Sequence, residues 1–334
     1  MQELRIGIVG AGEVTRRAHL PVLMNMPGTT IAWLLDYKPE RADSLGRAFG
    51  VTAIRATRND ELPPCDVVLL ATPVEVRGEY LGHFRLTPTA ILCEKPFALT
   101  AAAHTKAIGE FPPHRLGCGY MRRYYRSTML LRRIVAEGLF GPLSAISIHE
   151  GNRSKGSGVD SSFLDDRYTG AARGVLADLG SHSIDLALHI SGAQSFRVKS
   201  LARVMDGSVD RKVDASVDLD CSTLPGGHSV DLNYGVSWLD RQDNCIRLTF
   251  EHATVWSGLA PSSEVYVGDP KRPDDAITVK SPVIGASTFN QAFYLEWKDF
   301  LDGVRQGRES LVSARSALLT TTLVEELSSH DAAT

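Results

Sequence analysis

The first third of the chain alternates short apolar runs with longer amphipathic stretches. Apolar side chains predominate in four runs that are expected to form buried strands, at residues 4–9, 30–35, 66–71 and 90–93. Helices are expected between them at 14–24, where Pro21 must bend or end the helix, and at 39–49, which Gly50 ends. Continuous apolar strands separated by helices are typical of a parallel sheet that is covered on both faces.

Beyond about residue 120 the pattern changes. A helix is expected at 127–137, a half-buried strand at 144–149 and a further helix at 175–190. Residues 197–267 carry runs of period two separated by turn residues, which predict antiparallel strands: VDASVDLDC, GHSVDLNYGVSW, NCIRLTFEH and SEVYVG. Helical spacing returns at 296–304, where one apolar stripe is formed by Trp297, Phe300, Leu301 and Val304.

Length and composition favour two globular domains. With 334 residues, 43% of them hydrophobic, each part of the chain can bury a core of its own. The change of pattern near residues 117–120 leads us to expect one domain at 1–119 and another at 120–334. A net charge of −3 provides no basic surface for nucleic acid or a membrane.

The remaining composition points to a cytoplasmic protein. The N-terminus lacks the pattern of a secretion signal, and no apolar run approaches the length of a membrane span. The five cysteines are scattered and include no CxxC pair, so a disulfide framework and a zinc cluster are not expected. Reduced thiols and no bound metal are the expectation.

A glycine-rich turn, Gly10-Ala11-Gly12-Glu13-Val14-Thr15, follows the first expected strand. It has the first two glycines of the dinucleotide fingerprint G-x-G-x-x-G, whereas Thr15 replaces the third. Gly10 would allow a tight turn and Gly12 would let a pyrophosphate approach the backbone, at the N-terminus of the next helix. The alternative is an ordinary glycine turn.

An acidic residue accompanies this turn. Asp36 ends the second expected strand, 24 residues beyond Gly12, about where a carboxylate binds the ribose hydroxyls in dinucleotide-binding domains. A carboxylate there repels a 2′-phosphate and so favours NAD over NADP. Lys38 and Arg41 stand close by and could attract that phosphate, and a plain surface aspartate is the alternative.

Polar residues also mark one face of the otherwise apolar segment GVLADLGSHSIDLALHISG at 174–192. They are Asp178, His182, Asp185 and His189, spaced at i, i+4, i+7 and i+11. Three interpretations compete: solvated or capping side chains, a metal site, and a pair in which Asp178 orients His182 for proton exchange with a substrate. The stripe is about 16 Å long, too long for all four residues to reach one ion, and we favour the third interpretation.

A charged pair interrupts the apolar pattern in ILCEKPFAL at 91–99. Glu94 and Lys95 follow an expected strand directly, and Pro96 ends it. The carboxyl end of a parallel strand lies at the edge where open α/β sheets bind ligands, so these charges are expected in an active-site crevice. The alternative is a structural ion pair between Lys95 and Glu94.

Together these motifs resemble the Gfo/Idh/MocA family of sugar and cyclitol oxidoreductases. The resemblance spans nearly the whole chain and rests on GIVGAGEVTRRAHLPVL at 7–23, ATP at 71–73, CEKPFALT at 93–100, GYMRRY at 119–124 and DLGSHSID at 178–185. It implies an α/β fold: an N-terminal Rossmann domain with a doubly wound parallel sheet, then an α/β domain with a large open, mostly antiparallel sheet. It also implies NAD or NADP as cofactor, a sugar-like substrate, a cis Lys95-Pro96 bond and a homodimer or homotetramer joined through the second sheet.

The resemblance also implies roles for individual residues. Lys95 matches the family lysine beside the nicotinamide and the reacting oxygen, and Asp178 and His182 match its D-x-x-x-H pair. We expect His182 to exchange the proton, Lys95 to stabilise charge on the substrate oxygen and Asp178 to orient His182. The residues expected to bind the cofactor are Gly10, Gly12, Glu13, Val14, Asp36, Tyr37, Thr72, Pro73, Glu94 and Lys95. Those expected to bind the substrate are Tyr120, Arg123, Tyr124, Arg153, Asp178 and His182.

Two departures from the family pattern leave the substrate class open. Val74 and Arg77 stand where many members have Asn and His, and Ala172-Arg173-Gly174 replaces a GGG segment. The expected function is hydride transfer between NAD(P) and a hydroxyl or keto carbon of a sugar, cyclitol or nucleotide-sugar. The alternatives are an NAD-dependent glycoside hydrolase of the same family and a non-catalytic dinucleotide-binding regulator, which would typically have lost the lysine or the histidine.

Overall fold

The computed structural model describes residues 3–56, 58–152, 174–269 and 271–329. The chain forms two compact units. Unit 1 comprises Met1–Met121 and Phe289–Leu318, and unit 2 comprises Arg122–Thr288 and Leu319–Thr334. The linear division expected from the sequence, between residues 119 and 120, does not include the return of the chain to unit 1 at Phe289.

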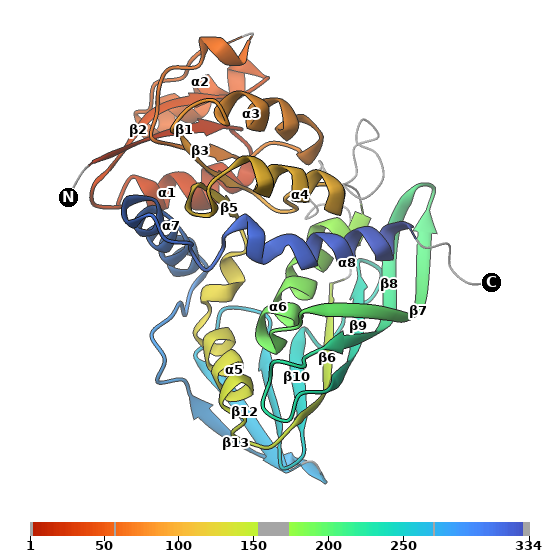
Figure 1. Ribbon diagram of the computed structural model, residues 1–334. Helices are drawn as coiled ribbons and strands as arrows, with labels where there is room; N and C mark the ends of the chain where they lie inside the picture. Colours follow the sequence, from red (N-terminus) through yellow and green to blue (C-terminus); the bar gives the residue numbers. More distant parts are fainter. Residues whose placement is uncertain (1–2, 57, 153–173, 270, 330–334) are drawn as a thin grey trace. The chain divides into compact units, whose positions relative to one another are not determined.

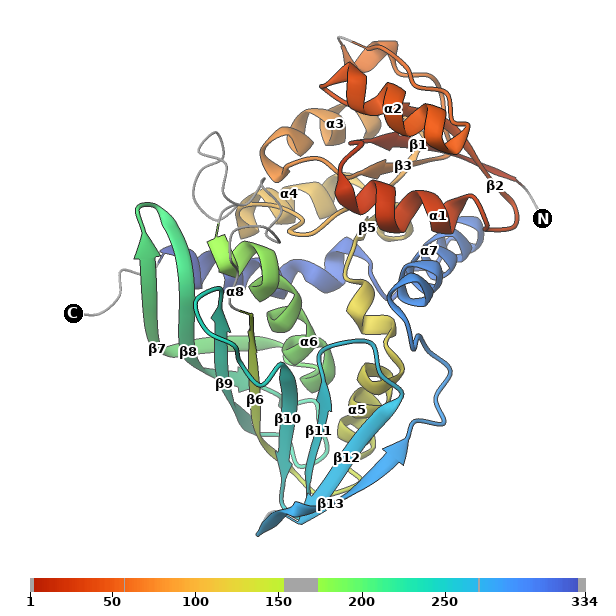
Figure 2. The same ribbon diagram turned by 180° about the vertical axis from the view of Figure 1, so that it is seen from behind.

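Unit 1 is built on a parallel sheet of five short strands in the order β2-β1-β3-β4-β5. The strands are β1 (Leu4–Val9), β2 (Thr29–Leu35), β3 (Val67–Leu70), β4 (Ala90–Cys93) and β5 (Leu116–Cys118). Figure 1 shows one face of this sheet covered by α2 (Pro39–Phe49), α3 (Arg77–Phe84) and α4 (Ala101–Glu110). Figure 2 shows the other face, which is covered by α1 (Leu20–Leu23) and α7 (Phe289–Gln306). The doubly wound parallel sheet expected from the sequence is confirmed.

The helix expected at 14–24 contains a wider turn than a regular α-helix. Thr15–His19 forms a π-helical turn that continues into α1, and Pro21 lies in the first turn of α1. Proline has no amide hydrogen to donate and crowds the preceding carbonyl, and a π turn accommodates both effects. The last residue of this turn, His19, is completely buried.

The apolar stripe of α7 explains why the chain returns to unit 1. Trp297, Phe300 and Leu301 are each at most 1% exposed, and α7 contacts both α1 and the π turn Thr15–His19. The expected helical stripe is therefore confirmed, although its spacing gives no sign of which core it joins. Short 3₁₀ turns occur at Asn59–Glu61, Val74–Val76, Pro113–Arg115, Met121–Tyr124 and Ala314–Ala317.

Unit 2 contains an eight-stranded sheet in the order β13-β12-β11-β10-β6-β9-β8-β7. Its strands are β6 (Leu143–Gly151), β7 (Ser195–Asp206), β8 (Val209–Asp220), β9 (Ser229–Ser237), β10 (Cys245–Phe250), β11 (Thr254–Gly258), β12 (Glu264–Asp269) and β13 (Arg272–Lys280). Neighbouring strands run antiparallel except for β6 and β9, which are parallel. The large, mostly antiparallel sheet is confirmed, and the four runs identified by alternation became β8, β9, β10 and β12.

One face of this sheet carries the core of unit 2. Figures 1 and 2 show α5 (Arg126–Glu137), α6 (Ser181–Ser191) and α8 (Leu318–Ser329) on that face, and their apolar residues join those of the strands in one cluster. A π-helical turn, Leu176–Gly180, leads into α6. Alternate side chains of the strands point to the opposite face, on which the described residues place no helix.

The carboxyl ends of β1 to β4 meet at one edge of the sheet in unit 1. Because β1 lies between β2 and β3, the connections after β1 and β3 leave toward opposite faces at this edge. Such a switch point is where open α/β sheets bind their ligands. Gly10, Asp36, Thr72 and Glu94 all stand within two residues of these strand ends.

Candidate active site

The glycine turn after β1 is closed against the neighbouring strand end. Gly10 has a φ of +108°, and a Cβ atom there would lie 2.3 Å from the carbonyl oxygen of Ala71. A Cβ on Gly12 would meet no atom within 4 Å, so the space over this residue is open. Thr15, which replaces the third glycine of the fingerprint, donates a hydrogen bond of 2.7 Å to the Gly10 carbonyl and holds the turn in place.

Asp36 ties this turn to the end of β2. Its two carboxylate oxygens accept hydrogen bonds from the backbone N–H groups of Ala11 at 2.7 Å and Lys38 at 2.8 Å. Asp36 is 8% exposed, whereas the next residue, Tyr37, is 63% exposed. The carboxylate therefore has a fixed orientation next to an open aromatic side chain, an arrangement that suits an adenosine ribose.

Glu13, also expected to bind the cofactor, lies on the surface of the helix. It forms ion pairs with Arg16, at 2.7 Å, and with Arg17. The hydrogen bond from Arg16 lowers the pKa of Glu13 below its usual value. Val14, at the start of the same helix, is half-buried.

Buried polar atoms in the segment after β3 are available to form hydrogen bonds with a ligand. The hydroxyl of Thr72 and both carboxylate oxygens of Glu75 are buried and have no hydrogen-bond partner among the described residues. Buried polar groups are normally hydrogen-bonded, so such orphaned atoms at a sheet edge fit a polar ligand. With the open space over Gly12, these residues fit a dinucleotide lying across the switch point, next to Pro73.

The backbone around Lys95 is fixed by three hydrogen bonds. The Lys95 N–H donates to the Glu94 carboxylate at 3.1 Å, and the guanidinium of Arg77 donates to the carbonyl oxygens of both Glu94 and Pro96. Arg77 is buried and also donates to the Thr72 carbonyl at 2.7 and 3.0 Å. The Lys95-Pro96 peptide bond is cis, which confirms that expectation. Lys95 itself is partly exposed.

Glu94 is held by a second network that extends into α7. His19 Nε2 lies 2.8 Å from a Glu94 carboxylate oxygen, and the indole N–H of Trp297 donates to His19 Nδ1 at 2.9 Å. Burial raises the pKa of Glu94, but the hydrogen bond from His19 and the charges of Lys95 and Arg77 together bring it below its usual value. Glu94 is therefore an ionised carboxylate inside unit 1.

In unit 2 the helix that carries Asp178 and His182 begins at a fixed point. Asp210 accepts a hydrogen bond of 2.8 Å from the backbone N–H of Leu176. Gly174 has a φ of +87°, and a Cβ there would lie 2.5 Å from the Asp210 carboxylate. This turn therefore needs a glycine, and the chain retains one at Gly174. The other two residues of the departing segment, Ala172 and Arg173, and the expected substrate residue Arg153 lie outside the described residues.

The polar stripe of this helix separates into two parts. Asp178 and His182 are partly exposed. Asp185 is fully buried and accepts two hydrogen bonds from Arg123, at 2.9 and 2.5 Å, and one from Thr320 at 3.1 Å. The interpretation of the stripe as a four-residue metal site is therefore wrong, because Asp185 is committed to Arg123.

His189, at the far end of the stripe, lies in a cationic environment. Arg132 donates to the His189 backbone carbonyl. Burial and the charges of Arg123 and Arg132 hold the pKa of His189 well below its usual range. His189 is therefore a neutral, structural histidine.

The expected substrate residues of the GYMRRY segment are mostly buried. Tyr120 is 1% exposed, Tyr124 5% and Arg123 2%. The ion pair with Asp185 favours a structural role for Arg123 over binding of an anionic substrate. The adjacent Arg122, which we did not predict, pairs with Glu150 at 2.8 and 2.9 Å. Burial lowers the pKa of Arg122, but the interactions with Glu150, Tyr125 and Asp178 outweigh burial and raise this pKa above its usual value. Arg122 therefore lies within electrostatic reach of Asp178.

The residues singled out from the sequence thus form two groups. The turn after β1, Asp36, Thr72 and the Glu94-Lys95 pair come together at the edge of the sheet in unit 1, and Asp178 and His182 share a helix in unit 2. The approach of Lys95 to His182 stays a prediction. Sequence reasoning missed two buried contributors, His19 and Trp297, whose only signal is a polar atom within an apolar pattern.

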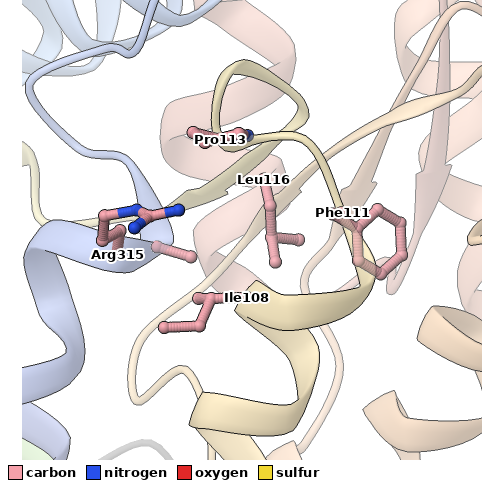
Figure 3. A pocket seen from close by; sticks show the side chains of 6 residues that line it. Ile108, Phe111, Pro113, Leu116 and Arg315 are labelled. Carbon is pink, nitrogen blue, oxygen red and sulfur yellow. The ribbon is translucent and has the colours of Figure 1, made fainter.

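A small pocket in unit 1 lies away from this edge. It is lined by apolar residues at the amino end of β5 with one arginine at its rim, as Figure 3 shows: Ile108, Phe111, Pro113, Leu116, Ala314 and Arg315. Its volume of about 10 Å³ could hold at most a single water molecule and is far below the 300–1,000 Å³ that is usual for small-molecule sites. We therefore do not assign it to the cofactor or the substrate.

The described residues provide neither a metal cluster nor a membrane-spanning helix. Within the part of the chain that the structure describes, no group of three or more His, Cys, Asp or Glu side chains is arranged to hold a metal ion. Among the helices of these same residues, none has both the length and the apolar content to cross a membrane.

Curated relatives match this chain over different lengths. The rhizopine catabolism protein MocA of Rhizobium meliloti is 27% identical over 344 residues, which cover 99% of this chain and 97% of that protein. Glucose-6-phosphate 3-dehydrogenase of Bacillus subtilis is 26% identical over 219 residues, which cover 65% of this chain and 61% of that protein.

Solved structures share the fold of the whole chain. An aldose-aldose oxidoreductase from Caulobacter crescentus superposes with a TM-score of 0.80 at 19% identity, covering 98% of this chain and 96% of its own. A 3-ketoreductase from Actinomadura kijaniata, in complex with NADP and TDP-benzene, gives 0.79 at 17% identity and covers 98% and 97%. At such low identity these similarities concern the fold alone.

Two family models match successive parts of the sequence. The model for an oxidoreductase family with an NAD-binding Rossmann fold matches residues 4–111, and the model for the GFO/IDH/MocA C-terminal domain matches residues 128–255. The first match contains the glycine turn and the Glu94-Lys95 pair, and the second contains Asp178 and His182. This chain belongs to the Gfo/Idh/MocA family of oxidoreductases, whose first domain is an NAD-binding Rossmann fold.

Proposed function

We propose that this protein transfers a hydride between a nicotinamide dinucleotide and a hydroxyl or keto carbon of a sugar, cyclitol or nucleotide-sugar. The observation that carries the proposal is the fixed backbone of Lys95 at the carboxyl end of β4, on the same sheet edge as the glycine turn. The substrate class is supported by the printed names of the relatives, which include a glucose-6-phosphate 3-dehydrogenase and two inositol 2-dehydrogenases.

The proposed roles follow from the chemistry of an alcohol and its ketone. The bound dinucleotide supplies the hydride chemistry. Lys95 donates a hydrogen bond to the substrate oxygen and stabilises the negative charge that develops on it. His182 takes the hydroxyl proton during oxidation and returns it during reduction, and Asp178 holds His182 in orientation. A positioned acid–base group of this kind contributes roughly 10²–10⁴-fold to the rate.

The glycine turn after β1, together with Asp36, supports NAD as the preferred cofactor. The residues that would hold it are Gly10, Gly12 and Asp36, with the orphaned polar atoms of Thr72 and Glu75 next to them. Asp36 places a carboxylate near the adenosine ribose, where it repels the 2′-phosphate of NADP. The positive charge of Lys38 nearby attracts that phosphate, so the preference for NAD over NADP is partial.

We also propose that the protein is a cytoplasmic homodimer or homotetramer joined through the sheet of unit 2. The exposed face of that sheet carries a stack in which Arg247 lies 4.6 Å from the Trp256 ring and Tyr266 stacks on Trp256 at 5.7 Å. Such flat cation–aromatic stacks suit a protein interface. All five cysteines are free thiols, which supports a reducing compartment.

The proposed function is tested with Lys95→Met and His182→Ala. Turnover of a sugar or cyclitol should fall by about 10²-fold or more in each variant, while NAD binding by calorimetry stays near that of the wild type. Mass spectrometry of ligands that co-purify under native conditions should identify the dinucleotide and a polyol. Near-normal turnover in either variant would exclude the assigned roles, and aglycone release without net NADH formation would indicate a glycoside hydrolase instead.

A further inference from the structure

The buried chain Trp297–His19–Glu94 ends at the backbone of Lys95. Trp297 donates from its indole N–H to His19 Nδ1 at 2.9 Å, and His19 Nε2 lies 2.8 Å from Glu94. The other oxygen of the same carboxylate accepts the Lys95 N–H at 3.1 Å. Three segments far apart in the sequence, namely α7, the π turn Thr15–His19 and the end of β4, are therefore linked through side-chain polar atoms.

The direction of these hydrogen bonds follows from the indole group. An indole nitrogen can only donate, so Nδ1 of His19 must accept and carries no proton. The single proton of the neutral ring is then on Nε2, where it points at Glu94. A second proton on Nδ1 would set two donors against each other inside a fully buried site. Trp297 therefore selects one tautomer of His19 and, through it, one orientation of the Glu94 carboxylate.

This arrangement excludes a proton relay along the chain. The indole N–H does not exchange protons as an acid or a base, so a proton that reached His19 could go no further. Phe293 packs edge-on against the imidazole at a ring distance of 5.0 Å and closes another side of it. The hydrogen bonds from Trp297 through His19 to Glu94 instead fix the orientation of the Glu94 carboxylate. One carboxylate oxygen bonds to His19 and the other to the Lys95 N–H.

We propose that His19 and Trp297 are positioning residues for Lys95. They orient the Glu94 carboxylate, which holds the Lys95 amide group while Arg77 holds the flanking carbonyl groups. The proposal rests on the proposed function, because it assigns Lys95 to the reacting oxygen. It goes beyond that function by making α7, a segment almost two hundred residues distant in sequence from Lys95, part of the machinery that aims this lysine.

The decisive variants are Trp297→Phe, His19→Leu and His19→Gln. Trp297→Phe keeps an aromatic side chain but removes the pyrrole part of the indole with its N–H, and His19→Leu removes both hydrogen bonds. His19→Gln restores a donor toward Glu94 and an acceptor toward Trp297. Trp33→Phe is the matched control, because Trp33 is equally buried in unit 1 and donates its N–H to Pro63, in a loop remote from Lys95.

The first measurement does not depend on turnover. In protein with ¹⁵N-labelled histidine, NMR should show His19 with a proton on Nε2 alone, and Trp297→Phe should disturb that tautomer. Hydrogen exchange at the Lys95 amide should become about tenfold faster in Trp297→Phe and His19→Leu, but not in Trp33→Phe or His19→Gln. A wild-type His19 protonated on both nitrogens, or equal exchange in Trp297→Phe and Trp33→Phe, would overturn the proposal.

The second measurement uses turnover. We expect kcat to fall by about 10- to 100-fold in Trp297→Phe and His19→Leu, with the dissociation constant of NAD nearly unchanged, because misplacing a catalytic group slows the reaction without weakening cofactor binding. His19→Gln should recover most of kcat. Equal kcat losses in His19→Gln and His19→Leu would mean a structural role alone. If the wild type turned over no sugar or cyclitol, the proposed function would fail while the NMR and exchange results still decided the hydrogen-bond chain.

Discussion

Arg77 holds the carbonyl groups on both sides of Lys95, the residue to which we assign the reacting oxygen. Its guanidinium also donates to Thr72, so one buried side chain joins the loop after β3 to the turn after β4. The family pattern often has histidine at this position. A planar guanidinium holds these three carbonyl oxygens from donors in a fixed geometry, whereas an imidazole has at most two N–H groups and an ammonium has three donors without the planar fork.

Replacing Arg77 with lysine should therefore loosen Lys95. We expect Arg77→Lys to lower kcat by about tenfold or more and to lower the melting temperature, measured by steady-state kinetics and calorimetry. The matched control is Arg115→Lys, since Arg115 donates to the carbonyls of Thr87 and Thr89 just before β4, at the opposite end of the same strand. Equal losses of kcat in the two variants would show that the clamp on Lys95 has no role of its own.

The carboxylate of Asp36 should set the preference between NAD and NADP. Asp36→Asn removes the negative charge near the adenosine ribose and keeps one acceptor for the backbone of Ala11 or Lys38. We expect the dissociation constant of NAD to rise and that of NADP to fall, so that their ratio shifts by about tenfold toward NADP.

Fluorescence titrations of Asp36→Asn and the wild type at one ionic strength measure this shift. Asp43→Asn serves as the control, because Asp43 is an aspartate of α2 that pairs with Arg55 at the surface, at 2.6 Å. An unchanged NAD/NADP ratio in Asp36→Asn would remove Asp36 from cofactor selection.

Much of unit 1 could be predicted because its signals are local. Uninterrupted apolar runs give β1 to β4 nearly to the residue, and Gly50, with a φ of +67°, ends α2 as expected. The place of Lys95 at a strand end follows from the same runs. Where side chains bond across distant segments, as Trp297 does with His19, spacing gives no information, since the apolar stripe of α7 would look the same with any partner.

The polar stripe that runs from the π turn Leu176–Gly180 into α6 shows the limit of periodicity more clearly. Asp178, His182, Asp185 and His189 share one helical face, and their spacing alone treats them alike. The structure divides them, because Arg123 enters from a segment about sixty residues earlier and neutralises Asp185. The strands β7, β11 and β13 were not among the predicted runs, although β7 alternates exposed and half-buried residues along much of its length.

The buried pair of Arg123 and Asp185 should matter for stability and little for catalysis. Removing one partner of a buried pair leaves an unpaired charge, so Asp185→Asn should lower the free energy of unfolding by about 3–5 kcal/mol. The substrate KM of the folded variant should stay unchanged. Urea unfolding and steady-state kinetics test both statements.

The control for Asp185→Asn is Asp218→Asn on the outer strands of unit 2. Asp218 pairs with Arg197 and Lys199 at the surface, where solvent screens an ion pair and its contribution to stability is small. A large rise in substrate KM in Asp185→Asn, at a temperature where it remains folded, would return Arg123 to the list of substrate residues.

His104 should make unit 1 sensitive to acid. The side chain is completely buried, stacks on Phe97 at 4.1 Å and bonds through Nε2 to the Ala314 carbonyl at 2.9 Å. Burial lowers the pKa of His104 to about 4, from an ordinary value of 6.5. Below pH 6.5 the unfolded chain therefore binds a proton at this residue that the folded chain refuses until about pH 4, so acid favours unfolding. By pH 4 this difference removes about 3 kcal/mol of stability.

His104→Gln keeps a hydrogen-bond donor for Ala314 and cannot bind that proton. Its free energy of unfolding should accordingly fall less steeply than that of the wild type between pH 7 and pH 4, even if the variant is less stable at pH 7. Urea unfolding at several pH values measures the two slopes, with His252→Gln as a control because His252 lies on the surface. Identical slopes for His104→Gln and the wild type would mean that the buried imidazole is protonated as readily in the folded chain as in the unfolded one.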